Sequence, residues 1–288
     1  MAAGADDVEA RLSRFGVDRL PYEQVDRRVS DLVDLTGVRA LVTGGGGKNL
    51  GQAIVHRLAG AGADVVVADL DGASAERVAT DAAERWSATT HAISGDTTSW
   101  DGAHAAVAES VNLLGGLDLL VNNVGGGAGE FATMSRERIE QIIATTLLST
   151  LYTSRAALDV MLPAQRGCIV NISSEGSRMA SAHISLYNSL KAGVNGFTKN
   201  LAAEVGRQGI RVVGVAPGMM LGDSLVETLR NPVGFESRVA SMEESLKRIS
   251  VGRCCLPEEV ANMVVFVASP AGSHVHGTTI AVGGGMSS

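Results

Sequence analysis

Short runs of apolar residues recur along this chain, and each is followed, after a turn, by a segment of helical length. The runs are rich in valine, leucine and isoleucine, as in VRALV at 38–42 and CIVNI at 168–172. Continuous apolar strands that alternate with helices predict βαβ units, in which a parallel sheet is buried on both faces. We expect strands near residues 38–42, 65–68, 91–94, 117–121, 168–172, 211–215 and 278–282. The expected helices lie near 52–61, 73–84, 100–111, 139–161 and 187–205, with a further helix beginning at Pro257.

This order of elements predicts a single α/β domain of the Rossmann type, a doubly wound parallel sheet with helices on both faces. We assign residues 37–288 to this domain. Residues 1–36 differ in being rich in charge and poor in apolar clusters, with Pro21 in their middle. We expect them to form an N-terminal extension with one or two short helices.

Composition and charge exclude several classes of function. The net charge of −7 argues against nucleic acid and anionic membranes as partners. No apolar run approaches the roughly 20 residues that a membrane span needs, and the first residues lack the order of a signal peptide. Three cysteines make no disulfide framework. We therefore expect a cytoplasmic protein that binds neither nucleic acid nor membrane.

A glycine-rich turn, TGGGGKNLG at 43–51, lies between the first expected strand and the first expected helix. Glycines let the backbone approach a pyrophosphate, whose charge is favoured at a helix N-terminus. A phosphate-transfer P-loop is excluded, because Lys48 is followed by Asn49 and not by Ser or Thr. The segment predicts a dinucleotide site, and a tight turn without a ligand is the alternative.

Asp69 ends the second expected strand, 18 residues after Gly51. This is close to the spacing of about 20 residues at which an acid binds the adenosine ribose. Its carboxylate would accept hydrogen bonds from the ribose hydroxyls and repel a 2′-phosphate. Lys48 is the opposing observation, because a base in the loop suits a 2′-phosphate. Since no Arg or Lys follows Asp69 directly, we expect NAD as the cofactor, with NADP as the alternative.

Tyr187 and Lys191 are four residues apart in an expected helix, and Ser174 follows the strand CIVNI. Residues at this spacing share a helix face, so the ammonium group would lie beside the phenol. A nearby positive charge favours phenolate and lowers a pKa that is ordinarily about 10. We therefore expect Tyr187 to be tuned towards general acid–base chemistry.

With these motifs in this order, residues 37–288 resemble the short-chain dehydrogenase/reductase family. The likeness rests on Thr43-Gly44 with Gly51, Asp96-Thr97, Asn122-Asn123-Val124-Gly125, Ser174 with Tyr187 and Lys191, and Pro217-Gly218. It implies hydride exchange between NAD(H) and a secondary alcohol or ketone, with Ser174, Tyr187 and Lys191 as catalytic residues. It also implies a homodimer or homotetramer. The cofactor contacts that it implies are Gly44, Asn49, Leu50, Gly51, Asp69, Leu70, Asp96, Thr97, Asn123, Gly125, Tyr187, Lys191, Pro217 and Gly218.

The chain departs from the family pattern in four places. The glycine loop is one residue longer, with Lys48 or Asn49 in place of the middle glycine; Thr146 stands for an Asn, Gly222 for a Thr and Gly283 for an Asp. The Asn of the family holds a water in a proton relay. We predict that the Thr146 hydroxyl holds such a water next to Lys191, and the alternative is that Thr146 only packs within its helix.

The substrate contacts that we predict are Ser174, Glu175, His183, Tyr187 and Met220, around an apolar pocket wall. We predict no metal site, since His274 and His276 have no carboxylate or cysteine nearby in the sequence. The alternative to an enzyme is a non-catalytic dinucleotide-binding or sensor protein on the same fold. A nucleotide-sugar epimerase would need a larger sugar-binding domain than the end of the chain supplies.

Overall fold

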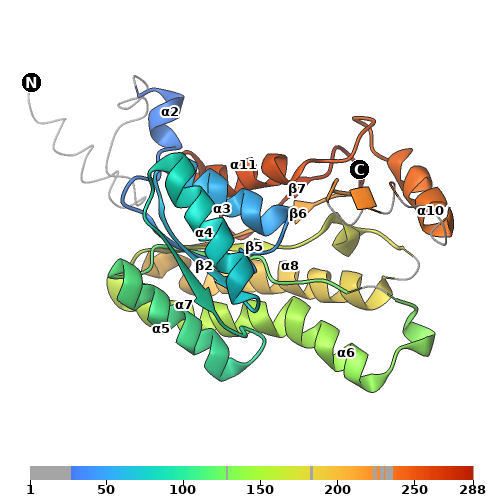
Figure 1. The fold of residues 1–288 in the computed structure, drawn as a ribbon, viewed down its shortest axis with the longest axis horizontal. Helices are drawn as coiled ribbons and strands as arrows, with labels where there is room; N and C mark the ends of the chain where they lie inside the picture. The colour runs from blue at the N-terminus through green and yellow to red at the C-terminus, as the bar shows by residue number, and fades with distance from the viewer. Residues whose placement is uncertain are drawn as a thin grey trace, which may run out of the picture.

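A seven-stranded parallel sheet forms the centre of the molecule (Figure 1). The computed structural model describes residues 27–127, 129–181, 184–222, 226–227, 230 and 236–287. The strand order is β3-β2-β1-β4-β5-β6-β7, and the paired strands are parallel throughout. The strands are β1 (Arg39–Thr43), β2 (Asp64–Asp69), β3 (Thr90–Ser94), β4 (Leu119–Asn122), β5 (Gly167–Ile172), β6 (Ile210–Pro217) and β7 (Thr279–Val282). The order reverses between β1 and β4, which confirms the predicted doubly wound fold.

Helices cover both faces of the sheet and enclose two separate cores (Figure 1). Successive side chains of a strand point to opposite faces, so Val65 and Val67 join one core and Val66 joins the other. The first core is closed by α3 (Leu50–Gly60), α4 (Gly72–Trp86) and α11 (Pro257–Ala268). The second is closed by α5 (Trp100–Leu114), α7 (Ser149–Ala164) and α8 (Ser185–Val205). This two-sided burial explains why the strands read as continuous apolar runs.

Several helices begin at a polar cap that the sequence supplies. The side chains of Asp71, Ser99 and Ser135 accept hydrogen bonds from backbone N–H groups in the first turns of α4, α5 and α6 (Arg136–Ile143). Pro257 opens α11, where its missing N–H costs nothing. These caps satisfy donors that a helix terminus otherwise leaves without partners.

The long helix expected at 139–161 is divided into three consecutive pieces. α6 continues into the π-helical turn Ala144–Leu148, which continues into α7. Within and beside this turn the Thr145 hydroxyl donates to the Gln141 carbonyl, and the Ser149 hydroxyl donates to the Thr145 carbonyl. Such turns are frequent at functional sites, and this one contains the fully buried Thr146.

A buried network of polar side chains fixes α7 and α8 to the middle of the sheet. The Asn122 amide donates to Ser154 and to the Asn171 oxygen, both at 2.9 Å, and the Asn171 amide donates to Thr198 at 2.9 Å. The Thr153 hydroxyl donates a hydrogen bond to the side-chain oxygen of Asn122. A buried network whose members are satisfied favours one arrangement of the elements it joins. It therefore sets the position of α8, the helix that carries Tyr187 and Lys191.

Two further α-helices are α2 (Val29–Leu32) and α10 (Glu236–Leu246), and short 3₁₀ helices lie at Phe131–Thr133, Glu175–Arg178, Gly206–Gln208 and Pro270–Gly272. Leu35, in the segment assigned to the N-terminal extension, is fully buried, and its N–H donates to the Ala61 carbonyl. The last part of that segment is thus packed against the domain, while residues 1–26 lie outside the described residues. No helix in the described ranges is both long and apolar enough to cross a membrane.

Candidate active site

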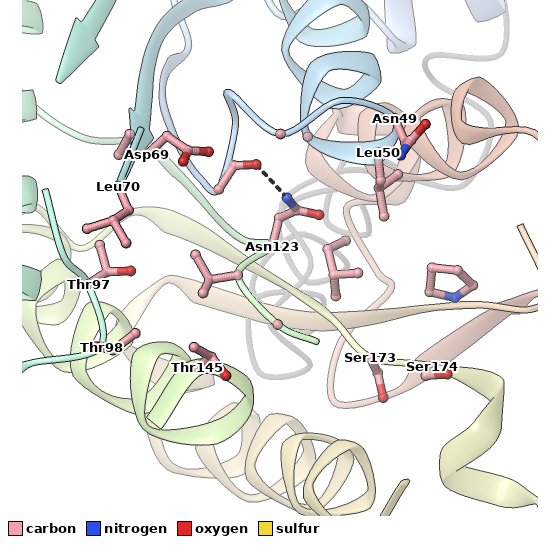
Figure 2. A pocket seen from close by; sticks show the side chains of 18 of the residues that line it. Asn49, Leu50, Asp69, Leu70, Thr97, Thr98, Asn123, Thr145, Ser173 and Ser174 are labelled. Carbon is pink, nitrogen blue, oxygen red and sulfur yellow. Dashed lines mark hydrogen bonds between the residues drawn. The ribbon is translucent and has the colours of Figure 1, made fainter. Parts of the chain in front are cut away.

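A cavity of about 500 Å³ opens at the carboxyl ends of the central strands, across the switch point between β1 and β4. Figure 2 shows Asp69 and Leu70 at one end, Ser173 and Ser174 at the other, and Asn123 between them. Ser174 and Met220, two of the predicted substrate contacts, belong to its lining. So do all the residues for which dinucleotide contacts were predicted: Gly44, Asn49, Leu50, Gly51, Asp69, Leu70, Asp96, Thr97, Asn123, Gly125, Tyr187, Lys191, Pro217 and Gly218.

The glycine-rich loop makes a turn so close that side chains are excluded from it. A Cβ atom at Gly51 would lie 2.1 Å from the Gly44 carbonyl oxygen, far inside contact distance. Gly44 itself has φ of 63°, a conformation that favours glycine. The side chain of Asn49, the residue before α3, makes no capping hydrogen bond to this helix, which begins in the loop. The backbone and the helix terminus together form a cradle that fits a pyrophosphate.

Asn49, one of the two residues considered for the place of the middle glycine, has a positive φ. Its backbone has φ of 85° and ψ of −112°, a conformation that a side chain makes costly. The side chain lies against Gly222, where a Cβ atom would be only 3.0 Å from the Asn49 Cγ. Two of the departures from the family pattern, at 49 and at 222, are therefore in contact with each other. The glycine at 222 leaves room for the amide of Asn49.

The end of the cavity at β2 carries acidic side chains, and there the glycine-rich loop packs against α4. The Asp69 carboxylate accepts a hydrogen bond from the Asp71 N–H at 3.1 Å, and Asp71 in turn caps α4 through Ser74. A hydrogen bond from the Ser74 hydroxyl is the main reason that the pKa of Asp71 is lowered. A Cβ atom at Gly46 would lie 2.7 Å from the Ala75 nitrogen, so the loop rests on the first turn of α4.

The segment after β4 connects the glycine loop with the far end of the cavity. The Asn123 amide donates to the Gly44 carbonyl at 3.0 Å (Figure 2), and the Asn123 N–H donates to the Thr43 hydroxyl at 3.2 Å. A Cβ atom at Gly125 would lie 2.9 Å from the Lys191 Nζ. Gly125 therefore allows the backbone to pass directly beside this ammonium group.

Ser174, Tyr187 and Lys191 come together at the end of the cavity formed by β5 and α8. Lys191 is buried, its Nζ donates to the Ile172 carbonyl at 2.6 Å, and burial lowers its pKa to about 8. The Nζ is 5.9 Å from the centre of the Tyr187 ring. Burial raises the pKa of Tyr187, and a hydrogen bond with Ser174 lowers it in part. The pKa of Tyr187 is therefore shifted upwards, opposite to the direction expected from the helix spacing, because the phenol has lost solvent.

Thr146 does not line the cavity, and its hydroxyl is already engaged. It donates to the Gly126 carbonyl at 3.1 Å and accepts from the Gly126 N–H at 3.4 Å. Gly126 follows Gly125, which passes beside Lys191. The structure thus gives Thr146 a partner that the sequence did not indicate, the backbone of the loop after β4. A water held between Thr146 and Lys191 stays a prediction.

Replacing Thr146 with valine is expected to lower the free energy of unfolding by about 0.5–1.5 kcal/mol, because the hydrogen bonds between the Thr146 hydroxyl and the Gly126 backbone are lost. Thr146→Ser keeps the hydroxyl and serves as the matched control. Urea denaturation measures both effects. The pH profile of turnover tests the relay separately. A valine variant with wild-type turnover from neutral to alkaline pH would leave Thr146 with the role of holding the loop.

Of the remaining predicted substrate contacts, one lines the cavity, one is turned away from it and one is not described. Met220 lines the cavity and pairs with Cys255 in a parallel β-bridge. Glu175 is 2 % exposed and its side chain is turned towards Gly218 and Gly283, so no part of it lines the cavity. The glycine at 283 leaves the space that this carboxylate fills. His183 lies outside the described residues.

Sequence reasoning missed several residues of the cavity wall. Most of them lie at strand ends near predicted site residues, one lies in the glycine loop and one in the π-helical turn; they are Gly47, Ala68, Gly95, Thr98, Val124, Thr145, Ile172 and Ser173. The position of a residue at the carboxyl end of a strand was the available signal for most of them. Thr145 had no such signal, because the π-helical turn that presents it was not predicted.

Comparison with known proteins gives one family for most of the chain. The model of a family described as Enoyl-(Acyl carrier protein) reductase matches residues 45–287. The 3-oxoacyl-[acyl-carrier-protein] reductase FabG of Aquifex aeolicus is 34 % identical over 255 residues, covering 88 % of this chain and 99 % of that protein.

Two solved structures of similar proteins contain bound nucleotides. One is a 7α-hydroxysteroid dehydrogenase in complex with NADH and 7-oxo glycochenodeoxycholic acid. It has a TM-score of 0.81 and 30 % identity over 89 % of this chain and 96 % of that one. The other, from Agrobacterium tumefaciens, is provisionally described as a 2-deoxy-d-gluconate 3-dehydrogenase and holds NADP. Its TM-score is 0.79, with 30 % identity over 89 % of this chain and 98 % of that one.

Proposed function

Since the chain belongs to the short-chain dehydrogenase/reductase family of oxidoreductases, we propose that it transfers a hydride between NAD(H) and a secondary alcohol or ketone. The observation that carries this proposal is a single cavity with Asp69 and the glycine loop at one end and Ser174, Tyr187 and Lys191 at the other. A dinucleotide needs a site that holds its adenosine ribose and pyrophosphate at one end and its nicotinamide at the other. The reaction needs an acid–base group at the nicotinamide end.

Several features support a dinucleotide in this cavity. The cradle at Gly44 and Gly51 would hold the pyrophosphate, and Asp69 would hold the adenosine ribose. Lys191, whose Nζ makes one hydrogen bond within the described residues, would hold the second ribose with its remaining donors. When bound, the nicotinamide ring supplies the hydride acceptor or donor.

The residues of the chain would handle the proton and the substrate oxygen. Ser174 would donate a hydrogen bond to that oxygen, and Tyr187 would take the hydroxyl proton from an alcohol or return it to a ketone. Lys191 would stabilise the phenolate, which burial otherwise disfavours. The pKa of Lys191, about 8, makes it a group that can itself exchange a proton near neutral pH.

The packing around Asp69 supports NAD over NADP. A 2′-phosphate would meet the carboxylates of Asp69 and Asp71, and the N-terminus of α4 already has its cap. Lys48 lines the cavity but is exposed, so solvent screens its attraction for a phosphate.

Asp69→Ala is expected to weaken NAD binding and to strengthen NADP binding relative to it, by on the order of tenfold, the effect of about 1.4 kcal/mol. Dissociation constants of both nucleotides, measured by calorimetry, report this ratio. Lys48→Ala is the companion variant. A wild type that prefers NADP, together with loss of that preference in Lys48→Ala, would reverse the assignment.

The substrate class is tested by turnover. A panel of 3-oxoacyl thioesters, steroid alcohols, and cyclic and aromatic secondary alcohols or ketones, followed by NADH absorbance, samples the chemistry of the relatives and of the apolar wall at Met220. Turnover of one class supports the proposal. Nucleotide binding without turnover of any class would support the alternative, a non-catalytic dinucleotide-binding or sensor protein.

A further inference from the structure

Glu175 follows Ser174 directly and places an acidic group behind the wall of the cavity. Its side chain is 2 % exposed. One carboxylate oxygen, Oε1, accepts a hydrogen bond from the Ser287 hydroxyl at 2.7 Å. The other, Oε2, is buried without a hydrogen-bond partner among the described residues. Burying a carboxylate in this way is costly unless its charge meets an opposite one.

Two glycines make room for this carboxylate. A Cβ atom at Gly283 would lie 1.5 Å from Oε2, so no other residue is accommodated there without moving Glu175. A Cβ atom at Gly218 would lie 2.9 Å from the same oxygen. Because Gly218 lines the cavity and Glu175 does not, the carboxylate lies just behind the backbone that forms the wall.

The surrounding backbone holds the group in this position. The Gly218 N–H donates to the Val282 carbonyl at 3.1 Å, which joins the ends of β6 and β7. The Val251 N–H donates to the Gly284 carbonyl at 3.1 Å, so the C-terminal segment 283–287 is also tied to the residues after α10. Glu175 is thus held in place behind the wall, and no ion pair to it is found within the described ranges.

The charge lies at the reacting end of the cavity. Gly218 and Ser174 line the same cavity, and the proposed hydride transfer requires the nicotinamide ring to lie beside the substrate oxygen that Ser174 would hold. That ring carries a positive charge when oxidised and none when reduced. A fixed anion in a wall of low polarity interacts much more strongly with a cation than it would in water.

We propose that Glu175 makes the site bind the oxidised dinucleotide in preference to the reduced one, and so favours oxidation of the alcohol substrate. This inference rests on the proposed function. The effect of one buried charge is expected to be on the order of tenfold in the ratio of the two dissociation constants. For a two-electron couple, tenfold corresponds to about 30 mV in the potential of the bound cofactor.

The test is the ratio of the dissociation constants for NAD⁺ and NADH, measured by calorimetry on the full chain without substrate. Glu175→Gln keeps the shape and removes the charge, and is expected to shift the ratio about tenfold towards NADH. Glu175→Asp keeps the charge and is expected to stay near the wild-type ratio. Glu84→Gln removes a carboxylate that is exposed on α4, where solvent screens it, and should leave the ratio unchanged.

Ser287→Ala provides a second test, which does not alter the carboxylate. Loss of the hydrogen bond to Oε1 leaves the charge less compensated, so the preference for NAD⁺ should increase. An unchanged ratio in folded Glu175→Gln overturns the inference. If that variant does not fold, an unchanged ratio in Ser287→Ala overturns it. In either case binding of both nucleotides leaves the proposed function intact, whereas a wild type that binds neither overturns the proposed function and this inference together.

Discussion

Tyr187→Phe is expected to lower kcat by about 10²–10⁴-fold, the usual contribution of a general acid–base group. The ring stays in place and only the hydroxyl that exchanges the proton is lost. NADH binding should therefore change little, because the glycine loop, Asp69 and Lys191 are untouched. Steady-state turnover and NADH fluorescence titration measure the two effects separately.

Tyr152→Phe is the matched control for this variant. Tyr152 lies on α7 with its ring 5.6 Å from that of Trp100, away from the cavity. Loss of its hydroxyl should leave turnover near the wild-type rate. If Tyr187→Phe kept more than about a third of the activity, well outside the range for such a group, Tyr187 would not be the proton donor.

Gly51→Ala is expected to abolish measurable dinucleotide binding. The added methyl group would lie 2.1 Å from the Gly44 carbonyl oxygen, a backbone atom that cannot rotate away. The loop would have to open, and the first turn of α3 would move with it. Calorimetric titration with NAD measures the loss, and thermal unfolding shows whether the domain remains folded.

Gly196→Ala makes the same chemical change where there is room for it. Gly196 lies within α8, and a Cβ atom there would meet no atom within 4 Å. Alanine is also the better helix former, by about 1 kcal/mol. This variant should bind the dinucleotide normally and be equally or more stable. Normal binding by Gly51→Ala would mean that the loop does not form the pyrophosphate cradle.

Most residues of the cavity could be found before the structure because they are next to strand ends. In a parallel sheet the carboxyl ends of the strands meet at one edge, so Asp69 and Ser174, which follow expected strands, were expected at that edge. Asn123 and Pro217 were expected there from the resemblance to the family. Tyr187 and Lys191 share a helix face by their spacing. Local patterns of period two and period 3.6 carry this information, and the cavity lining agrees with it.

Contacts between distant segments could not be predicted in the same way. The Asn49 side chain lies against Gly222, and the Thr146 hydroxyl is bonded to the Gly126 backbone. These pairs are separated in the chain and follow no periodic pattern. A residue that matches a motif predicts a role at its own position. It does not show which distant residue will contact it when a side chain is replaced by a smaller or different one.

The sequence by itself determined the architecture of this protein, which follows from local hydrophobic periodicity. It also predicted the residues that line the cavity, from their places after strands and from motifs that resemble those of the family. Only the tertiary structure decided the electrostatics. Burial raises the pKa of Tyr187 where the helix spacing alone indicated a decrease. It was also the packing of β6, β7 and the C-terminal segment that turned Glu175 away from the cavity and left its carboxylate buried in the wall. Desolvation depends on every group that surrounds a charge, and those groups come from all parts of the chain.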